Sequence, residues 1–141
     1  MILVLNKKGG CGCTTIAYNI VSLFNLPLYV YESSFLYDND NLSHFKDIRS
    51  MADIKTTTKF GVCDIGSRYN STRKENKAME LRCKIAGVAV IPFELGFENI
   101  DLTIQTIIDV RKWNKNLKIV LILNRLDNDD DTKDFLVKND F

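Results

Sequence analysis

Short apolar runs alternate with longer amphipathic stretches along most of the chain, and this alternation limits the fold more than any other feature. The runs are rich in β-branched and aromatic residues, and they occupy residues 2–5, 28–31, 60–65, 88–91 and 119–123. Runs of this length and composition are typical of strands that are buried on both faces of a parallel sheet. The alternation therefore predicts an α/β domain in three layers, with a mostly parallel central sheet and helices on both faces.

The stretches between the runs place apolar residues on one side of a helix. Their spacing predicts helices over residues 14–24, 73–84 and 99–113. Thr72 and Glu75 have the spacing of a capping box, which marks the start of the second of these helices. Ligand sites in such folds lie at the carboxyl ends of the strands, so we expect the functional residues there.

Two segments depart from the alternation. Residues 33–59 are polar, and apolar residues at positions 42, 45, 48 and 51 predict one short helix inside an otherwise irregular excursion. The segment 128–141 contains three consecutive aspartates, which favour a helix start, and it offers only Phe135, Leu136 and Val137 for packing.

The overall composition is that of one globular domain spanning residues 1–141. Hydrophobic residues make up 45% of the chain, and 19 basic side chains nearly balance 18 acidic ones, for a net charge of +1. The hydrophobic content argues against a disordered chain. The near-zero net charge gives no global electrostatic field that would attract nucleic acid or anionic lipid. No apolar run approaches the ~20 residues that span a membrane, and no export signal is present, so we expect a cytoplasmic protein with reduced thiols.

A glycine-rich loop joins the first predicted strand to the first predicted helix, and residues 6–15 read Asn-Lys-Lys-Gly-Gly-Cys-Gly-Cys-Thr-Thr. Glycines allow successive backbone amides to face one anion, and the helix amino terminus adds its partial positive charge. The hydroxyl of Thr14 is placed to reach a phosphate-bound magnesium ion. Strand, loop and helix in this order predict a phosphate-binding loop.

The loop resembles the deviant Walker A motif, Lys-Gly-Gly-x-Gly-Lys-Thr-Thr, of the ParA/MinD family of P-loop ATPases. The matching residues keep the order and spacing of the motif, and they are Lys8, Gly9, Gly10, Gly12, Thr14 and Thr15, with Cys11 at the variable position. Lys8 matches the lysine that distinguishes this family from other P-loop proteins. Cys13 stands where the family has the lysine that holds the β- and γ-phosphates.

Later segments are similar to the family in the same order. Asp64, in Val-Cys-Asp-Ile-Gly, matches the aspartate of a Walker B-type strand, and Asn124 matches a strand-terminal asparagine that contacts adenine. Residues 91–94 and the long helix after them resemble the segment that follows the next strand. After the second strand, Glu32-Ser33-Ser34 replaces the Asp-x-Asp-Pro of the family, so the second acidic residue is lost.

The resemblance implies a partition-type protein that binds ATP or ADP with Mg²⁺ and works as a homodimer with DNA and an adaptor protein, without a membrane anchor. In it the amides of residues 10–15 would hold the phosphates, and Thr14 and Asp64 would hold the metal. Asp64 would also orient the attacking water, Lys8 would reach the nucleotide of the partner copy, and Asn124 would contact adenine.

Two functional interpretations remain open. The first interpretation is a nucleotide-binding partition protein with weak or no hydrolysis. The missing lysine removes one charge-assisted contact to a phosphate, and this loss costs about 1.5–3 kcal/mol, or about ten- to a hundredfold in affinity. The second is a non-catalytic remnant that serves as a binding or dimerisation module without nucleotide. Cys13 and the lost acidic residue at Ser34 favour the second.

Several residues also have simpler interpretations. Asp64 precedes Ile-Gly-Ser and can form a turn instead of binding metal. Cys11 and Cys13 can be tolerated small residues, a reactive thiol at a helix start or part of a metal site with Cys63. A basic group beside Trp113 consists of Arg111, Lys112, Lys115 and Lys118, and it fits a solvated helix end better than a DNA contact.

Overall fold

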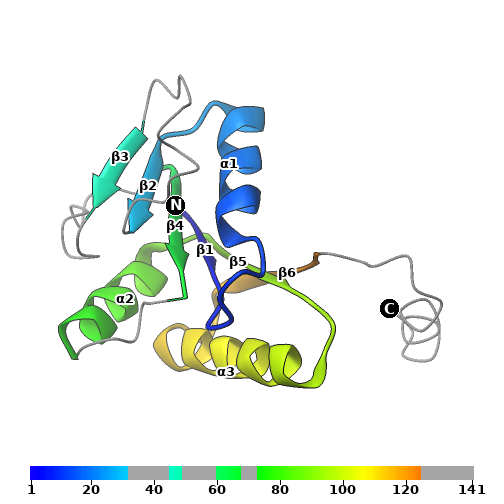
Figure 1. Cartoon of the computed structure of the whole chain (residues 1–141). Helices are drawn as coiled ribbons and strands as arrows, with labels where there is room; N and C mark the ends of the chain where they lie inside the picture. The colour runs from blue at the N-terminus through cyan, green and yellow to red at the C-terminus, as the bar shows by residue number, and fades with distance from the viewer. Residues whose placement is uncertain (32–44, 49–59, 68–72, 125–141) are drawn as a thin grey trace.

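The computed structural model describes residues 1–31, 45–48, 60–67 and 73–124, which form one parallel sheet with helices on both faces (Figure 1). The sheet has the strand order β3-β2-β4-β1-β5-β6, and every neighbouring pair is parallel. The elements are β1 (Ile2–Leu5), α1 (Cys13–Phe24), β2 (Leu28–Tyr31), β3 (Phe45–Ile48), β4 (Val62–Gly66), α2 (Arg73–Ile85), β5 (Val88–Phe93), α3 (Phe97–Trp113) and β6 (Lys118–Leu123). The predicted α/β fold is confirmed.

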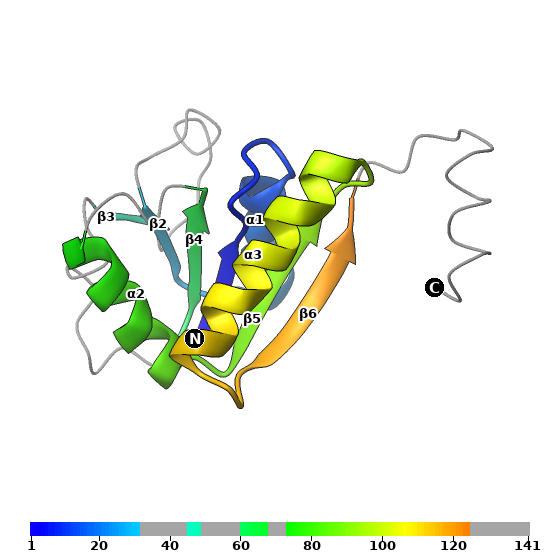
Figure 2. The ribbon, with the colours of Figure 1, turned by 90° about the horizontal axis from the view of Figure 1, so that it is seen from below.

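Helix α1 covers one face of the sheet, and α2 and α3 cover the other (Figure 2). Within β1, Leu3 and Leu5 point into the core beneath α2 and α3, whereas Val4 packs in the core beneath α1. All three side chains are fully buried, which explains why the central strands read as continuous apolar runs. None of the described helices is long and apolar enough to cross a membrane.

The predicted helix through residues 42–51 is wrong for residues 45–48, which form β3 instead. The strand pairs with β2 over its whole length, from Leu28 opposite Phe45 to Tyr31 opposite Ile48. The apolar spacing in this stretch fits a helix, but pairing with β2 gives backbone hydrogen bonds to both strands, and this tertiary contact overrides the local pattern. The other positions of this segment, the capping residue Thr72 and the segment 128–141 lie outside the described residues.

The side chain of Asn6 ties the end of β1 to its neighbours. Asn6 is fully buried, and its Nδ2 donates hydrogen bonds to the carbonyl of Pro92 at 2.8 Å and to Thr103 Oγ1 at 3.0 Å. Its Oδ1 accepts from the amide of Lys8 at 2.9 Å and from Thr106 Oγ1 at 3.3 Å. One side chain therefore fixes the start of the loop against both β5 and α3.

Replacing this amide should destabilise the fold. We expect Asn6→Ala to lower the free energy of unfolding by about 1–3 kcal/mol, because it leaves the partly buried amide of Lys8 and the buried carbonyl of Pro92 without these partners. Urea unfolding followed by circular dichroism measures the change. Asn19→Ala, at an exposed position of α1, is the matched control and should stay within about 0.5 kcal/mol. Equal stability of the two variants would show that the network contributes nothing.

Candidate phosphate-binding site

The glycine-rich loop lies between β1 and α1 at the carboxyl end of the sheet. Gly10 has φ 82° and Gly12 has φ 91°, both in the left-handed region that favours glycine. Gly12 is the N-cap of α1, and its carbonyl accepts the hydrogen bond from Ile16 N at 3.0 Å. A side chain at Gly12 would also collide with the amide of Asn124. Both glycines are therefore required by the bend that carries the chain into the helix.

Thr14 and Asp64 come together beside this bend. Thr14 lies in the first turn of α1, and Asp64 lies on β4, where it pairs with Val4 of the adjacent strand. The Thr14 hydroxyl donates a hydrogen bond to Asp64 Oδ2 at 2.8 Å, and Asp64 is almost completely buried. Hydroxyl and carboxylate oxygens are the ligand type that Mg²⁺ prefers, so this pair fits a magnesium ion bound together with phosphates.

Asn124 brings the end of β6 to the same loop. Its Nδ2 donates to the carbonyl of Cys11 at 3.0 Å, and its backbone amide donates to the carbonyl of Phe93 at 2.8 Å. These two bonds connect the loop with the carboxyl ends of β5 and β6. The residue predicted to contact adenine therefore lies against the predicted phosphate loop.

The two cysteines of the loop face the core. Their Sγ atoms lie 3.6 Å apart, and both side chains belong to the apolar cluster between α1 and the sheet. The hydrogen bond with Cys11, burial and the nearby Asp64 carboxylate raise the pKa of the Cys13 thiol, so it is neutral near pH 7. Cys63 belongs to the cluster on the opposite face, and the described residues contain no group of three or more metal-binding side chains.

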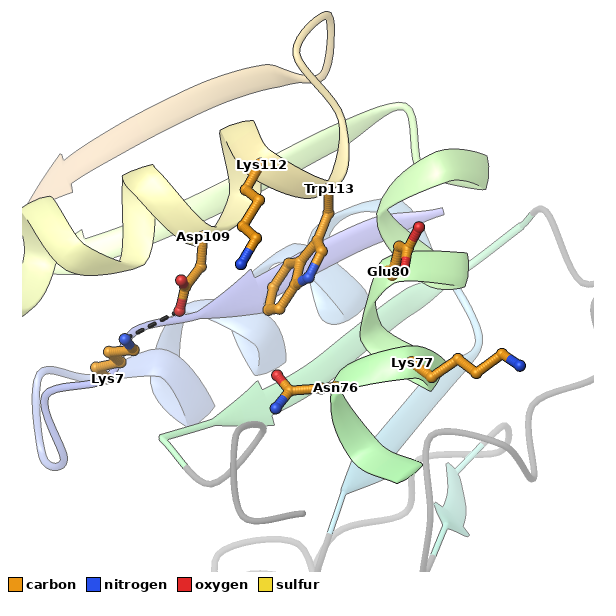
Figure 3. Close-up of a pocket in the computed structure, with 7 residues that line it drawn as sticks. All are labelled: Lys7, Asn76, Lys77, Glu80, Asp109, Lys112 and Trp113. Atoms are coloured by element: carbon orange, nitrogen blue, oxygen red, sulfur yellow. Dashed lines mark ion pairs between the residues drawn. The ribbon is translucent and has the colours of Figure 1, made fainter. Parts of the chain in front are cut away.

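The two lysines before the glycines have different environments. The backbone amide of Lys8 is held by Asn6, and the Lys8 side chain is half-buried. Lys7 Nζ pairs with Asp109 Oδ2 of α3 at 2.9 Å (Figure 3). This ion pair lies in an open pocket of about 780 Å³ between α2 and α3, which Lys112 and Trp113 also line. Lys7 therefore points to α3 and does not replace the lysine missing at Cys13.

The structure thus brings the residues expected from the sequence into one place. Residues 9–15 form the loop and the first turn of α1, and Asp64 and Asn124 contact it through Thr14 and Cys11. Glu32 and Ser34 lie outside the described residues. Asn6, Thr103 and Thr106 were missed, although two threonines on the sheet-facing side of an otherwise apolar helix pattern are the signal that could have indicated them.

Comparison with known proteins places this arrangement in a known fold. No protein-family model and no curated protein sequence matches the chain. A crystal structure of a plasmid partition protein from Borrelia burgdorferi is similar with a TM-score of 0.62 and 15% identity, covering 97% of this chain and 83% of that chain.

A second structure, of a plasmid partition protein from Borrelia burgdorferi B31 bound to AMPPNP, gives a TM-score of 0.64, also at 15% identity. It covers 97% of this chain and 81% of that chain. The mostly parallel sheet with flanking helices matches these structures, as the resemblance implied. The chain therefore has the α/β fold of these plasmid partition proteins.

Proposed function

We propose that this chain is a nucleotide-binding protein of plasmid or chromosome partition that binds ATP or ADP with Mg²⁺ in the loop of residues 8–15. The observation that carries the proposal is the bend at Gly10 and Gly12, which leads into α1 directly beside the Thr14–Asp64 pair. The partition protein of similar fold that is bound to AMPPNP supports the choice of ligand. We also propose that the protein lies in the cytoplasm, where ATP and Mg²⁺ are available.

Each part of the site has a role in this proposal. The backbone amides of residues 10–15 and the positive end of α1 bind the phosphates. Thr14 and Asp64 hold the magnesium ion, which neutralises phosphate charge when it is bound. Asp64 also orients the attacking water. Asn124 uses Nδ2 to hold the loop, and this leaves Oδ1 as an acceptor for the amino group of adenine.

Hydrolysis is weak or absent in this proposal. Charge on the transferred phosphoryl group is normally stabilised by fixed cations, and Cys13 supplies a neutral thiol at that position. Lys8 supplies part of the missing charge by reaching the nucleotide of a second copy, which requires a homodimer across the loop. DNA bound without sequence preference and an adaptor protein are the further partners, and the exposed Lys112 and Lys115 are candidate phosphate contacts.

A second candidate is a remnant module that binds no nucleotide. The observation that favours it is the position of Cys13, whose side chain packs in the apolar cluster under α1. A loop that no longer holds phosphate can keep its backbone shape because Asn6 and Asn124 fix it from both sides. The two candidates differ in whether ATP and Mg²⁺ change anything measurable.

Restoring the lysine tests the phosphate site directly. We expect Cys13→Lys to tighten the binding of a fluorescent ATP analogue with Mg²⁺ by about ten- to a hundredfold, because it adds one charge-assisted contact. The long lysine stem can leave the apolar cluster and place its ammonium in the loop. Cys13→Met has similar length without charge and should bind no tighter than the unaltered chain. If both substitutions give the same affinity, the charge at position 13 does not limit binding.

The state of assembly distinguishes the two candidate functions. With ATP and Mg²⁺ we expect the mass from light scattering to increase and retention on immobilised DNA to rise. Lys8→Ala should remove both effects, because Lys8 is the residue assigned to the nucleotide of the second copy. Lys7→Ala is the matched control, since Lys7 pairs with Asp109 and should leave both effects in place. Values that ATP does not change would support the remnant instead.

The reactivity of the thiols tests a third interpretation, in which Cys13 is a reactive nucleophile. All four cysteines are buried, and the raised pKa of Cys13 keeps its thiol protonated near neutral pH. We therefore expect slow reaction with Ellman's reagent in the native protein and four equivalents after unfolding in guanidinium. A fast native equivalent that Cys13→Ser removes would establish a reactive thiol at this position.

A further inference from the structure

Helix α3 carries an apolar stripe on the side that faces away from the sheet. It buries Thr103, Thr106 and Val110 against the sheet. The stripe consists of Phe97, Ile104 and Ile108, which are 93%, 48% and 58% exposed. Successive residues of a helix are about 100° apart, so these three side chains lie on one side of α3. Solvent exposure of three large apolar side chains on one side of a helix is characteristic of an interaction surface.

The edge strand β6 adds one exposed apolar side chain on the sheet face that α3 covers. Leu121 is 46% exposed, and it pairs with Ile91, which faces the core beneath α3. Leu121 therefore projects from the same face of the sheet as α3. Figure 2 shows α3 over the middle of the sheet and β6 at its outer edge, with no other described helix between them and solvent. We refer to Phe97, Ile104, Ile108 and Leu121 together as the α3–β6 face.

The charges beside the stripe are arranged symmetrically. Ile104 and Ile108 lie at equal distances along α3 from the level of residue 106, and so do the exposed Asp101 and Arg111. All four lie on the same side of the helix as Phe97. Rotation by half a turn about an axis at this level would therefore exchange the two isoleucines and also the acidic and the basic residue.

We propose that the α3–β6 face binds a second copy of this chain, with the two α3 helices antiparallel. In this arrangement Ile104 of each copy packs against Ile108 of the other, and Asp101 of each copy pairs with Arg111 of the other. Such an interface is isologous, so every favourable contact occurs twice. Antiparallel helices also place opposite dipole ends side by side.

The existing contacts of the two charged residues are compatible with this pairing. Asp101 Oδ2 accepts a hydrogen bond from Gln105 Nε2 at 2.8 Å, which leaves Oδ1 to accept another. Arg111 Nη1 donates to the carbonyls of Lys115 and Leu117, both at 2.8 Å, and this holds the guanidinium at the end of α3. The guanidinium has further donors on its other nitrogens, and these would meet the carboxylate of the second copy.

This interface differs from the proposed dimer across the phosphate loop. It involves α3 and β6 and includes no residue assigned to nucleotide. It should therefore form without ATP, and its failure would leave the nucleotide proposal unaffected. One helix pair and one strand edge form a small interface, so we expect association that depends on protein concentration in the micromolar range.

Sedimentation velocity of the full chain without nucleotide tests the proposal. Over about a hundredfold range of concentration in the micromolar regime, the weight-average mass should rise towards twice that of the monomer. Asp101→Lys and Arg111→Glu should each hold the mass near that of the monomer, because each places like charges opposite one another. An equimolar mixture of the two variants restores both opposite-charge pairs, so it should associate like the unaltered chain.

Glu98→Lys is the matched control. It makes the same charge change on the same helix, but position 98 lies off the stripe and would face the neutral Asn114 of the second copy. It should leave association unchanged, and circular dichroism establishes that every variant is folded. A chain that stays monomeric at every concentration, or a mixture that fails to associate, would overturn the proposal. Association that appears only after residues 125–141 are removed would also overturn it, because that segment of the same chain would then be the occupant of the face.

Discussion

The buried side-chain amide of Asn6 fixes the start of the glycine-rich loop, and the rest of the site depends on where this loop lies. A glycine-rich loop has few side chains of its own with which to fix its course, so its ends must be held by the scaffold. Asn6 fixes the first end, because it bonds the amide of Lys8 and at the same time β5 and α3. Asn124 fixes the middle through the carbonyl of Cys11. The bend at Gly10 and Gly12 is therefore held between two amide side chains.

The electrostatics of the loop follow from what occupies position 13. A neutral, buried thiol at this position leaves the backbone amides and the dipole of α1 as sources of positive potential, together with the magnesium ion that we propose at Thr14 and Asp64. These groups act on the ground-state phosphates as well as on the transition state, so they favour binding more than chemistry. Lys7 does not add to them because its ammonium is paired with Asp109. For this reason we propose nucleotide binding without efficient hydrolysis.

The sequence predicts the fold where a local pattern and a tertiary role agree. The runs that became β1 and β5 are buried on both faces, and their continuous apolar character is sufficient to identify them. Strand β3 was missed because its apolar spacing fits a helix, while its stability as a strand depends on pairing with β2. The hydrogen bonds of Asn6 with Thr103 and Thr106 of α3 could not be predicted either, because the bonded residues are 97 and 100 positions apart in the sequence. The inward direction of the Cys13 side chain also depends on residues that are distant in the sequence, because it packs in the cluster between α1 and the sheet.

The central claim is that the amides of the loop still form an anion-binding nest without the usual lysine. The most direct measurement follows the backbone amide resonances of the ¹⁵N-labelled chain during titration with ATP and Mg²⁺. The account predicts that the largest shifts occur in residues 9–15, with smaller shifts at Asp64 and Asn124. If these amides do not move while ATP reaches millimolar concentration, or if the shifts fall elsewhere on the sheet, the claim is contradicted.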